Sequence, residues 1–428
     1  MTASGTFDAD LVQAGGDKPG LAHLRRRAAR LMDMLVALWI FSGGIVLFEP
    51  SPYELTFLLL LPVAIFAGVG LYRSTLGLIG IIMVFTPFAL IACFQVKFST
   101  IPEALIFSIV TVFLMVTSYF VANYIADAPV RRMKLIMAAY TVIAVIAAAI
   151  GTLAYLGIMP AADLFLRYGR AKATFKDPNV YGPFLVLPAM FALQRVLLGR
   201  GWTVIFSGAI YMALFVGVFV SFSRAAWGHF AFSSLVVFAL VFLLESTARE
   251  KVRIMMMALL GGLMLLIALA GLLSIPAIGD LFETRTGAQT YDTGETGRFG
   301  RQAYAFDLAL QNPWGIGPGE FFNLRITENP HNLYVSVLHV YGWGGGAMFY
   351  LLFAVTLWKA FGTIARPSPY RLLAIPVFAT ITVVMGESII IESDHWRHLF
   401  LLIGMVWGLS TAIENAPRKP YRRDDALI

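Results

Sequence analysis

Apolar runs long enough to cross a bilayer recur along the whole chain, and they constrain its fold more than any other feature. The first covers 31–48 and the last covers 396–413. A helix needs about 20 apolar residues to cross a hydrocarbon core about 30 Å thick. Only 13% of the 428 residues are charged and 59% are hydrophobic, whereas soluble domains carry about 25% charged residues. The sequence therefore predicts an all-α, polytopic membrane protein.

About twelve spans are expected within a transmembrane domain that runs from 25 to 415. The expected spans are 31–48, 54–72, 75–95, 103–125, 135–157, 180–198, 203–222, 225–244, 254–274, 334–358, 372–391 and 396–413. The segment 1–24 is expected to be a disordered cytoplasmic tail, and 416–428 a basic cytoplasmic tail. The loops 158–178 and 275–333 are expected to be periplasmic, and the larger should contain short helices, one of them amphipathic over 298–312.

Lysine and arginine residues are divided unevenly between the two sides of the membrane. With the N-terminus inside, 21 of the 32 lie in inner segments, so the positive-inside rule supports this topology. The outer 11 are Lys97, Arg167, Arg170, Lys172, Lys176, Arg224, Arg285, Arg298, Arg301, Arg325 and Arg397. An anionic substrate at the outer face would explain basic residues on the disfavoured side. The position of these charges indicates such a substrate rather than nucleic acid.

Several classes of chemistry have no motif in the sequence. The single cysteine, Cys93, lies in an apolar run, which excludes a disulfide framework and a thiolate metal site. Zinc-protease, nucleotide-loop and serine-hydrolase motifs are absent, so metal and ATP chemistry have no support. The glycines at 315, 317 and 319 follow no expected strand and are interpreted as a flexible turn.

His331 is the strongest candidate for a general base, because it lies where the long loop re-enters the membrane. An ordinary histidine pKa of about 6.5 suits proton transfer from a sugar hydroxyl. The alternative is a helix-capping or interfacial histidine. His339 and His229 are expected to be packed or hydrogen-bonded core residues, and His395 and His398 to anchor the last span.

Three arginines could bind phosphate oxygens. Arg298 and Arg301 are three residues apart and would share a helix face, where two guanidinium groups suit phosphate, although a solvated face is the alternative. Arg224 interrupts a long apolar stretch, and a charge there is costly unless it is paired or lines a wet cavity. The segment 177–179, Asp-Pro-Asn, reads on its own as a turn and helix start, but basic residues precede it.

Five motifs in this order resemble the O-antigen ligase/polymerase family of bacterial surface glycan assembly. They are Phe175-x-Asp177-Pro178-Asn179, Ser223-Arg224-x-x-Trp227, Thr296-Gly297-Arg298, Pro313-x-Gly315-x-Gly317-x-Gly319 and His331-Asn332-x-Tyr334. The resemblance covers roughly 155–413, and the segment 394–398 looks like a motif from the end of the family's conserved region. It implies a fold similar to that of GT-C-type membrane glycosyltransferases.

The resemblance implies that His331 is the catalytic histidine and that Arg224 and Arg298 are essential arginines, whereas Arg301 has no family counterpart. The expected substrate-binding residues are Arg301, Arg167, Arg170, Lys176, Asp177, Asn179, Asn332, Tyr334 and Arg397. No metal ligand and no cofactor are expected.

The activity implied is transfer of a glycan from an undecaprenyl-diphosphate-linked donor in the bacterial inner membrane, at a site facing the periplasm. The preferred acceptor is lipid A–core, as in O-antigen ligation during lipopolysaccharide biosynthesis. The alternatives are a polymerase that uses a lipid-linked glycan acceptor for O-antigen or exopolysaccharide, and a transporter of lipid-linked glycan. Nucleotide sugars are not available outside the cell, so the donor's diphosphate linkage must carry the activation energy, and arginines can neutralise it as it leaves.

Overall fold

The computed structural model of the chain describes residues 19–287, 294, 297–324 and 328–416. Most of the expected cytoplasmic tails, Thr296 of the third motif and Arg325 lie outside this range. The first described helix, α2, begins at Pro19, so residues 19–24 of the expected disordered tail are helical.

The described residues form helices joined by short connections, which confirms the all-α prediction. In the first half these are α2 (Pro19–Ser42), α3 (Pro52–Ala67), η1 (Arg73–Thr75), α4 (Leu76–Ala92), α5 (Ile101–Asp127), α6 (Pro129–Tyr155), η2 (Ala162–Phe165), α7 (Pro178–Phe184), α8 (Val186–Leu198) and α9 (Trp202–Val220). In the second half they are α10 (Arg224–Leu240), η3 (Val241–Glu245), α11 (Ala248–Leu273), α12 (Pro276–Thr286), α13 (Arg298–Gln311), α14 (Glu320–Leu324), α15 (Leu333–Ala365), α16 (Arg371–Glu387) and α17 (Arg397–Asn415). One small antiparallel hairpin pairs β1 (Leu166–Arg167) with β2 (Arg170–Ala171).

Each of the twelve expected spans overlaps a helix, and eight helices in the described part of the chain are long and apolar enough to cross a membrane. The chain is therefore a multi-pass membrane protein. The expected spans that overlap α2, α3, α16 and α17 are not among these eight, so the number twelve stays a prediction. The expected amphipathic helix of the long loop is present as α13.

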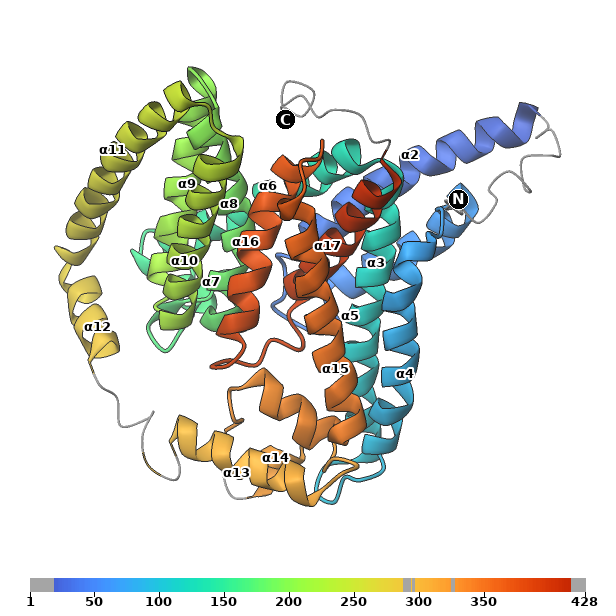
Figure 1. Cartoon of the computed structure of the whole chain (residues 1–428). Coiled ribbons are helices and arrows are strands. Elements are labelled where there is room, and N and C mark those ends of the chain that lie inside the picture. The colour runs from blue at the N-terminus through green and yellow to red at the C-terminus, as the bar shows by residue number, and fades with distance from the viewer. Residues whose placement is uncertain (1–18, 288–293, 295–296, 325–327, 417–428) are drawn as a thin grey trace.

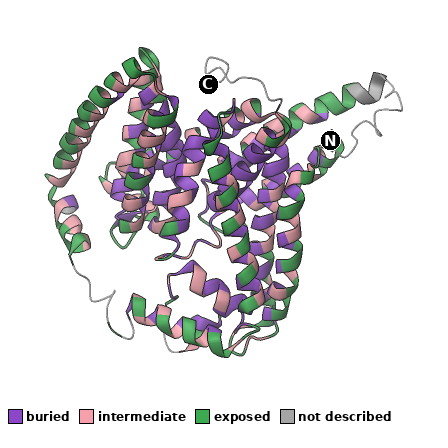
Figure 2. Ribbon diagram, in the orientation of Figure 1, coloured by how far each residue is buried: buried purple, intermediate pink, exposed green. Residues whose placement is uncertain are grey.

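The buried core runs through most of the bundle, with residues from α2 to α10 and from α15, α16 and α17 (Figure 2). Helices α13 and α14 lie at the bottom of the bundle in Figure 1, at the opposite end from the C-terminal end of α17. Helix α11 arcs along one side, and its most apolar 18-residue window has none of its residues buried. The long loop therefore connects a peripheral helix to the end of the bundle that carries α13.

Capping residues fix where several helices begin. Ser51 and Glu54 form a capping box at α3, and Thr100 with Glu103 does the same at α5. Each hydroxyl accepts from a backbone N–H of the first turn, and each glutamate accepts from the N–H of its capping residue. These polar pairs satisfy backbone groups at the helix ends that have no partner within the helix.

Helix α15 is broken at Gly342, whose φ of 72° and ψ of −176° are not helical. The glycine-rich segment packs into the break: Ile316 N–H donates to the carbonyl of His339 (2.7 Å), and Trp343 N–H donates to that of Pro313 (2.9 Å). A Cβ on Gly315 would lie 2.3 Å from the carbonyl oxygen of Val340. The structure thus corrects the interpretation of a flexible turn, because this segment satisfies backbone groups that the break exposes.

A polar contact joins α10 to α16 inside the bundle. His229 Nδ1 lies 2.8 Å from an oxygen of Glu387, and both side chains are buried. The other ring nitrogen of His229 lies 3.2 Å from the carbonyl oxygen of Thr380. His339 is also buried, with a ring nitrogen 3.0 Å from the carbonyl oxygen of Val335. Both histidines are core residues, as the sequence predicted.

Candidate anion-binding site

A cavity of about 510 Å³ lies between the long loop and the ends of several helices. Its lining residues are Arg170, Asn179, Phe222, Ser223, Arg224, Ala225, Arg285, Arg298, Phe299, His331, Ile390 and Ile391. Four of them are arginines, and no lining residue in the described part of the chain is acidic. Side chains from segments more than 200 residues apart therefore build one strongly positive site.

The β1–β2 hairpin carries Arg170 to the cavity. Tyr168 and Gly169 at its turn both have positive φ, as the tightest hairpin turns require. The Nε of Arg170 donates to the carbonyl of Ser221 (2.9 Å), and a terminal nitrogen donates to Oδ1 of Asn179 (2.8 Å). Burial, followed by the charge of Arg285, lowers the pKa of Arg170 to about 10. The guanidinium therefore stays charged at neutral pH and is held rigidly.

Arg224 is the first residue of α10, after the capping residue Ser223. Phe222, just before the cap, has a φ of 47°, a backbone conformation that is uncommon for an aromatic residue. This sharp turn between α9 and α10 leaves Arg224 exposed at the cavity. The sequence predicted that the charge of Arg224 would be paired or would line a cavity, and Arg224 lines a cavity.

Arg285 completes the set of arginines and was not among the site residues expected from the sequence. It lies in the last turn of α12. Phe282 of this helix stacks on Trp227 and Phe219, with ring centroids 5.5 and 6.0 Å apart. The Nε of Arg285 is buried and has no hydrogen-bond partner among the described residues. In the sequence, Arg285 stood out only as one of the 11 basic residues assigned to the outer side, because no motif surrounds it.

Arg298 and His331 reach the cavity from two separate segments of the long loop. Arg298 begins α13, and His331 immediately precedes Asn332, the capping residue of α15. His331 has a φ of 52°, in the left-handed region. Gln302, one turn along α13, donates to the carbonyl oxygen of His331 (3.3 Å). Sequence reasoning did not select Gln302, which connects the helix of Arg298 to the histidine turn.

The electrostatic surroundings keep the His331 ring neutral. Its pKa is lowered first by burial and then by the positive charges of Arg298 and Arg301, while Glu328 and Asp177 act weakly in the opposite direction. A lowered pKa means that the ring is neutral at neutral pH, with a proton on only one of its two nitrogens. His331 is therefore in the form that can accept one.

Arg301 does not line the cavity, although it lies one turn after Arg298. It is buried and forms an ion pair with Glu328. The sequence predicted that Arg298 and Arg301 bind substrate from one face of a helix. The structure does not place them so, because the Arg301 side chain is paired with Glu328. Its charge still reaches the site through its effect on the pKa of His331.

Two residues of the loop before α7 contact each other beside the cavity. Arg167 pairs with Asp177 at 3.3 Å and donates to the carbonyl of Lys176 (3.0 Å). Asp177 caps α7 by accepting from Asn179 N–H (2.7 Å). Of the residues expected in this loop, only Arg170 and Asn179 line the cavity.

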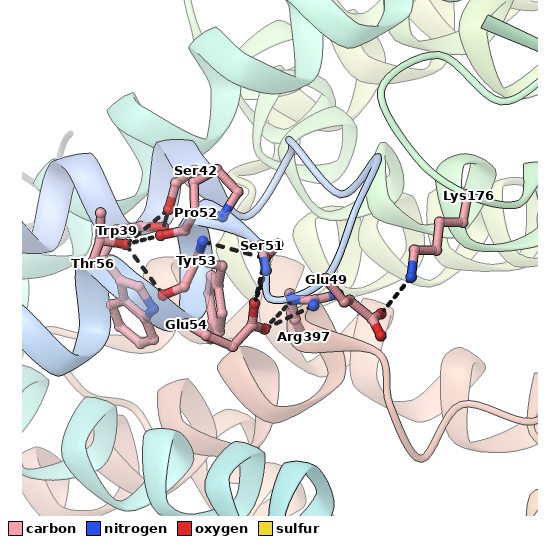
Figure 3. Close-up of polar contacts among 10 residues, drawn as sticks. All are labelled: Trp39, Ser42, Glu49, Ser51, Pro52, Tyr53, Glu54, Thr56, Lys176 and Arg397. Atoms are coloured by element: carbon pink, nitrogen blue, oxygen red, sulfur yellow. Dashed lines mark hydrogen bonds and ion pairs between the residues drawn. The ribbon is translucent and has the colours of Figure 1, made fainter. Parts of the chain in front are cut away.

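Three further expected substrate-binding residues are occupied elsewhere. Figure 3 shows Lys176 paired with Glu49 (3.1 Å) and Arg397 paired with Glu54 (2.7 Å), whose other oxygen caps α3. The hydroxyl of Tyr334 donates to the carbonyl of Met385 (2.7 Å).

The last of the expected residues, Asn332, is a capping residue whose side chain accepts from Val335 N–H (3.2 Å). These contacts give all four residues structural roles outside the cavity lining.

The arrangement suits one kind of ligand. Four arginines can bind a multiply charged anion such as a diphosphate, and a neutral histidine beside them can accept a proton from a neighbouring hydroxyl. Within the described residues, no group of three or more His, Cys, Asp or Glu side chains could hold a metal ion. The absence of a metal requirement stays a prediction.

Comparison with known proteins gives one family. Residues 208–350 match the family model described as O-antigen ligase, in agreement with the resemblance of the sequence motifs. The match contains Arg224, Arg285, Arg298 and His331, whereas Arg170 and Asn179 precede it. No match is found among curated proteins.

Proposed function

Taking residues 208–350 as a domain of the O-antigen ligase family, we propose that the protein transfers a glycan from an undecaprenyl-diphosphate-linked donor to an acceptor sugar. The preferred acceptor is lipid A–core, which makes the reaction O-antigen ligation. The observation that carries this proposal is the cavity in which four arginines face one neutral histidine. A lipid-linked diphosphate and a sugar hydroxyl are the two groups that such a site would bring together.

The arginines act on the leaving group. As the bond between the anomeric carbon and the diphosphate oxygen breaks, negative charge increases on the diphosphate. Fixed positive groups lower the energy of that state, because they need no reorganisation when the charge develops. Arg170 is held by Ser221 and Asn179 before any ligand binds, which supports a pre-organised role.

His331 acts on the acceptor. It removes the proton from the attacking hydroxyl while the acceptor oxygen forms its bond to the anomeric carbon. The donor's carbon–oxygen bond breaks on the opposite face, so the anomeric configuration inverts. The products are the extended acceptor, undecaprenyl diphosphate and a proton held on His331, which returns to solvent. The lowered pKa of His331 supports this role because it keeps the ring neutral, with one nitrogen able to accept a proton.

The charge distribution supports a site at the periplasmic face of the inner membrane. Helices α12 and α13 belong to the long loop that the positive-inside rule places outside. All four cavity arginines are among the 11 basic residues assigned to the outer side. This location is also where the donor's lipid-linked glycan would be presented.

A polymerase of lipid-linked repeat units is the second candidate, because it uses the same donor and differs only in its acceptor. A transporter of lipid-linked glycan is the third, but its charges should lie near the bilayer midplane. The cavity arginines instead lie at helix ends and in loops, which favours a transferase.

The direct test incubates purified protein with lipid-linked glycan and lipid A–core and measures formation of a new glycosidic bond. We expect product without ATP and loss of product in Arg298→Ala and His331→Ala. Arg249→Ala is the matched control, because this exposed arginine lies in the first turn of α11, far from the cavity. Wild-type rates in His331→Ala would refute the assignment of the base.

Accumulated intermediates distinguish the two acceptors. Cells that lack a ligase should keep long glycans on the carrier, whereas cells that lack a polymerase should keep single repeats. Mass spectrometry of the carrier-linked pool decides between them, and an unchanged pool would refute both activities.

A further inference from the structure

The loop between α16 and α17 brings one carboxylate against the turn that carries His331. Glu392 accepts from the side-chain amide of Asn329 (3.0 Å) and from the hydroxyl of Ser336 (2.8 Å). It also accepts a hydrogen bond from the backbone N–H of His331 itself. One side chain thus contacts residues before, at and after the histidine.

The turn needs such a support because its backbone conformation is unfavourable. A non-glycine residue at a φ of 52° occupies a sparsely populated region, and surrounding contacts must hold it there. On the far side, Gln302 donates to the carbonyl of His331. Glu392 therefore holds the backbone N–H of His331 and Gln302 holds its carbonyl, so the peptide groups on both sides of the His331 Cα are fixed.

The surroundings of Glu392 also distinguish it from an ordinary surface carboxylate. Burial and the neighbouring charge of Asp394 raise its pKa to about 7, against the effect of its three hydrogen-bond donors. A carboxyl group is costly to place there, and its contacts all converge on the histidine turn. Glu103, by contrast, is an exposed carboxylate that caps α5.

We propose that Glu392 is a positioning residue for His331: it holds the turn 329–336 so that the imidazole faces the cavity. It does not touch substrate and acts only through the histidine. This inference rests on the proposed role of His331 as the base. It adds a residue outside the matched family region, 208–350, to the machinery of the site.

The test is Glu392→Gln, which keeps the size of the side chain but replaces one accepting oxygen with a donor that faces other donors. We expect kcat to fall about 10²-fold, as small misplacements of a reacting group can cause. The affinity for lipid-linked donor should stay within twofold, because the arginines are untouched. Glu103→Gln is the matched control and should keep wild-type kcat.

A second comparison separates positioning from general damage. In the His331→Ala background, Glu392→Gln should cause no further loss of residual activity, because the group it positions is gone. If the Glu392 variant is recovered poorly, Ser336→Ala removes a single donor and should lower kcat in the same direction by a smaller factor.

Normal kcat in Glu392→Gln would overturn the proposal, as would an additional loss in the His331→Ala background. Failure of the proposed function would look different, because the wild-type protein would then form no glycosidic bond, and failure of the base assignment would leave His331→Ala with wild-type activity.

Discussion

Replacing Gly342 with alanine should damage the protein far more than the same change at Gly362, in the same helix. At a φ of 72° and a ψ of −176° the backbone is in a region that only glycine occupies readily, and an alanine there costs about 1–3 kcal/mol. The new Cβ would also lie 2.3 Å from the carbonyl oxygen of Pro313 and 2.6 Å from the carbonyl carbon of Trp314. Forcing apart such well-packed groups costs about another 1–3 kcal/mol.

The two effects together give a loss of about 2–6 kcal/mol, a large part of the roughly 5–15 kcal/mol that stabilises a typical folded protein. Gly362→Ala is the matched control, because Gly362 lies in the same helix and a Cβ there meets nothing within 4 Å. That change should be neutral or stabilising by up to about 1 kcal/mol.

The assay compares thermal unfolding of the two purified variants in the same detergent. Gly342→Ala should melt at least about 4 °C below Gly362→Ala. It should also lose transfer activity, because Gly342 lies in α15, which begins two residues after His331. Melting temperatures within one degree of each other would refute the reasoning, since they would show that the glycine-rich segment does not occupy the break.

Four further outcomes are expected. Arg285→Ala should lower the initial rate of transfer about 10²–10³-fold and Arg285→Lys should restore little of it; a normal rate would remove this arginine from the site. Because protonation disables the base and the pKa of His331 is lowered, kcat/KM should fall with decreasing pH at a midpoint below 6.5. Arg301→Gln should move that midpoint upward, because it removes a positive charge that lowers the pKa of His331 without removing a cavity arginine; an unchanged midpoint would contradict the cause assigned to the shift. Cysteines at the exposed positions Asp163 and Gly287, with the native cysteine removed, should react with an impermeant maleimide in intact spheroplasts, and labelling only after lysis would reverse the topology. Activity should survive excess EDTA, and a loss restored by Mg²⁺ would reveal a metal requirement.

The sequence predicted the helices well because each membrane span depends on the length and composition of its own apolar run. It also selected Arg224, which interrupts such a run, and His331, which lies where the long loop re-enters the membrane. Arg298 was selected for its helical spacing from Arg301 and for the motif that resembles the family. The structure brings these three residues to one cavity. Local signals were sufficient for both results.

What the sequence could not predict depends on contacts between distant segments. Arg301 and Arg397 resemble substrate-binding arginines until their partners, Glu328 and Glu54, are known. Arg285 was not selected because no motif surrounds it, and its helix is placed by aromatic packing against α9 and α10. Glu392 lies 61 residues after His331, and only the fold makes them neighbours.

The contact between His229 and Glu387 determines how α10 and α16 are positioned relative to each other. His229 follows Arg224 by five residues on α10, and Glu387 ends α16 just before the loop that holds Glu392. A slip of α10 by one turn would move Arg224 by about 5.4 Å and would leave both buried polar groups without each other, which is costly in a nonpolar interior. The pair therefore fixes the position of α10 along α16. It holds Arg224 and the loop that carries Glu392 at the same level along the bundle.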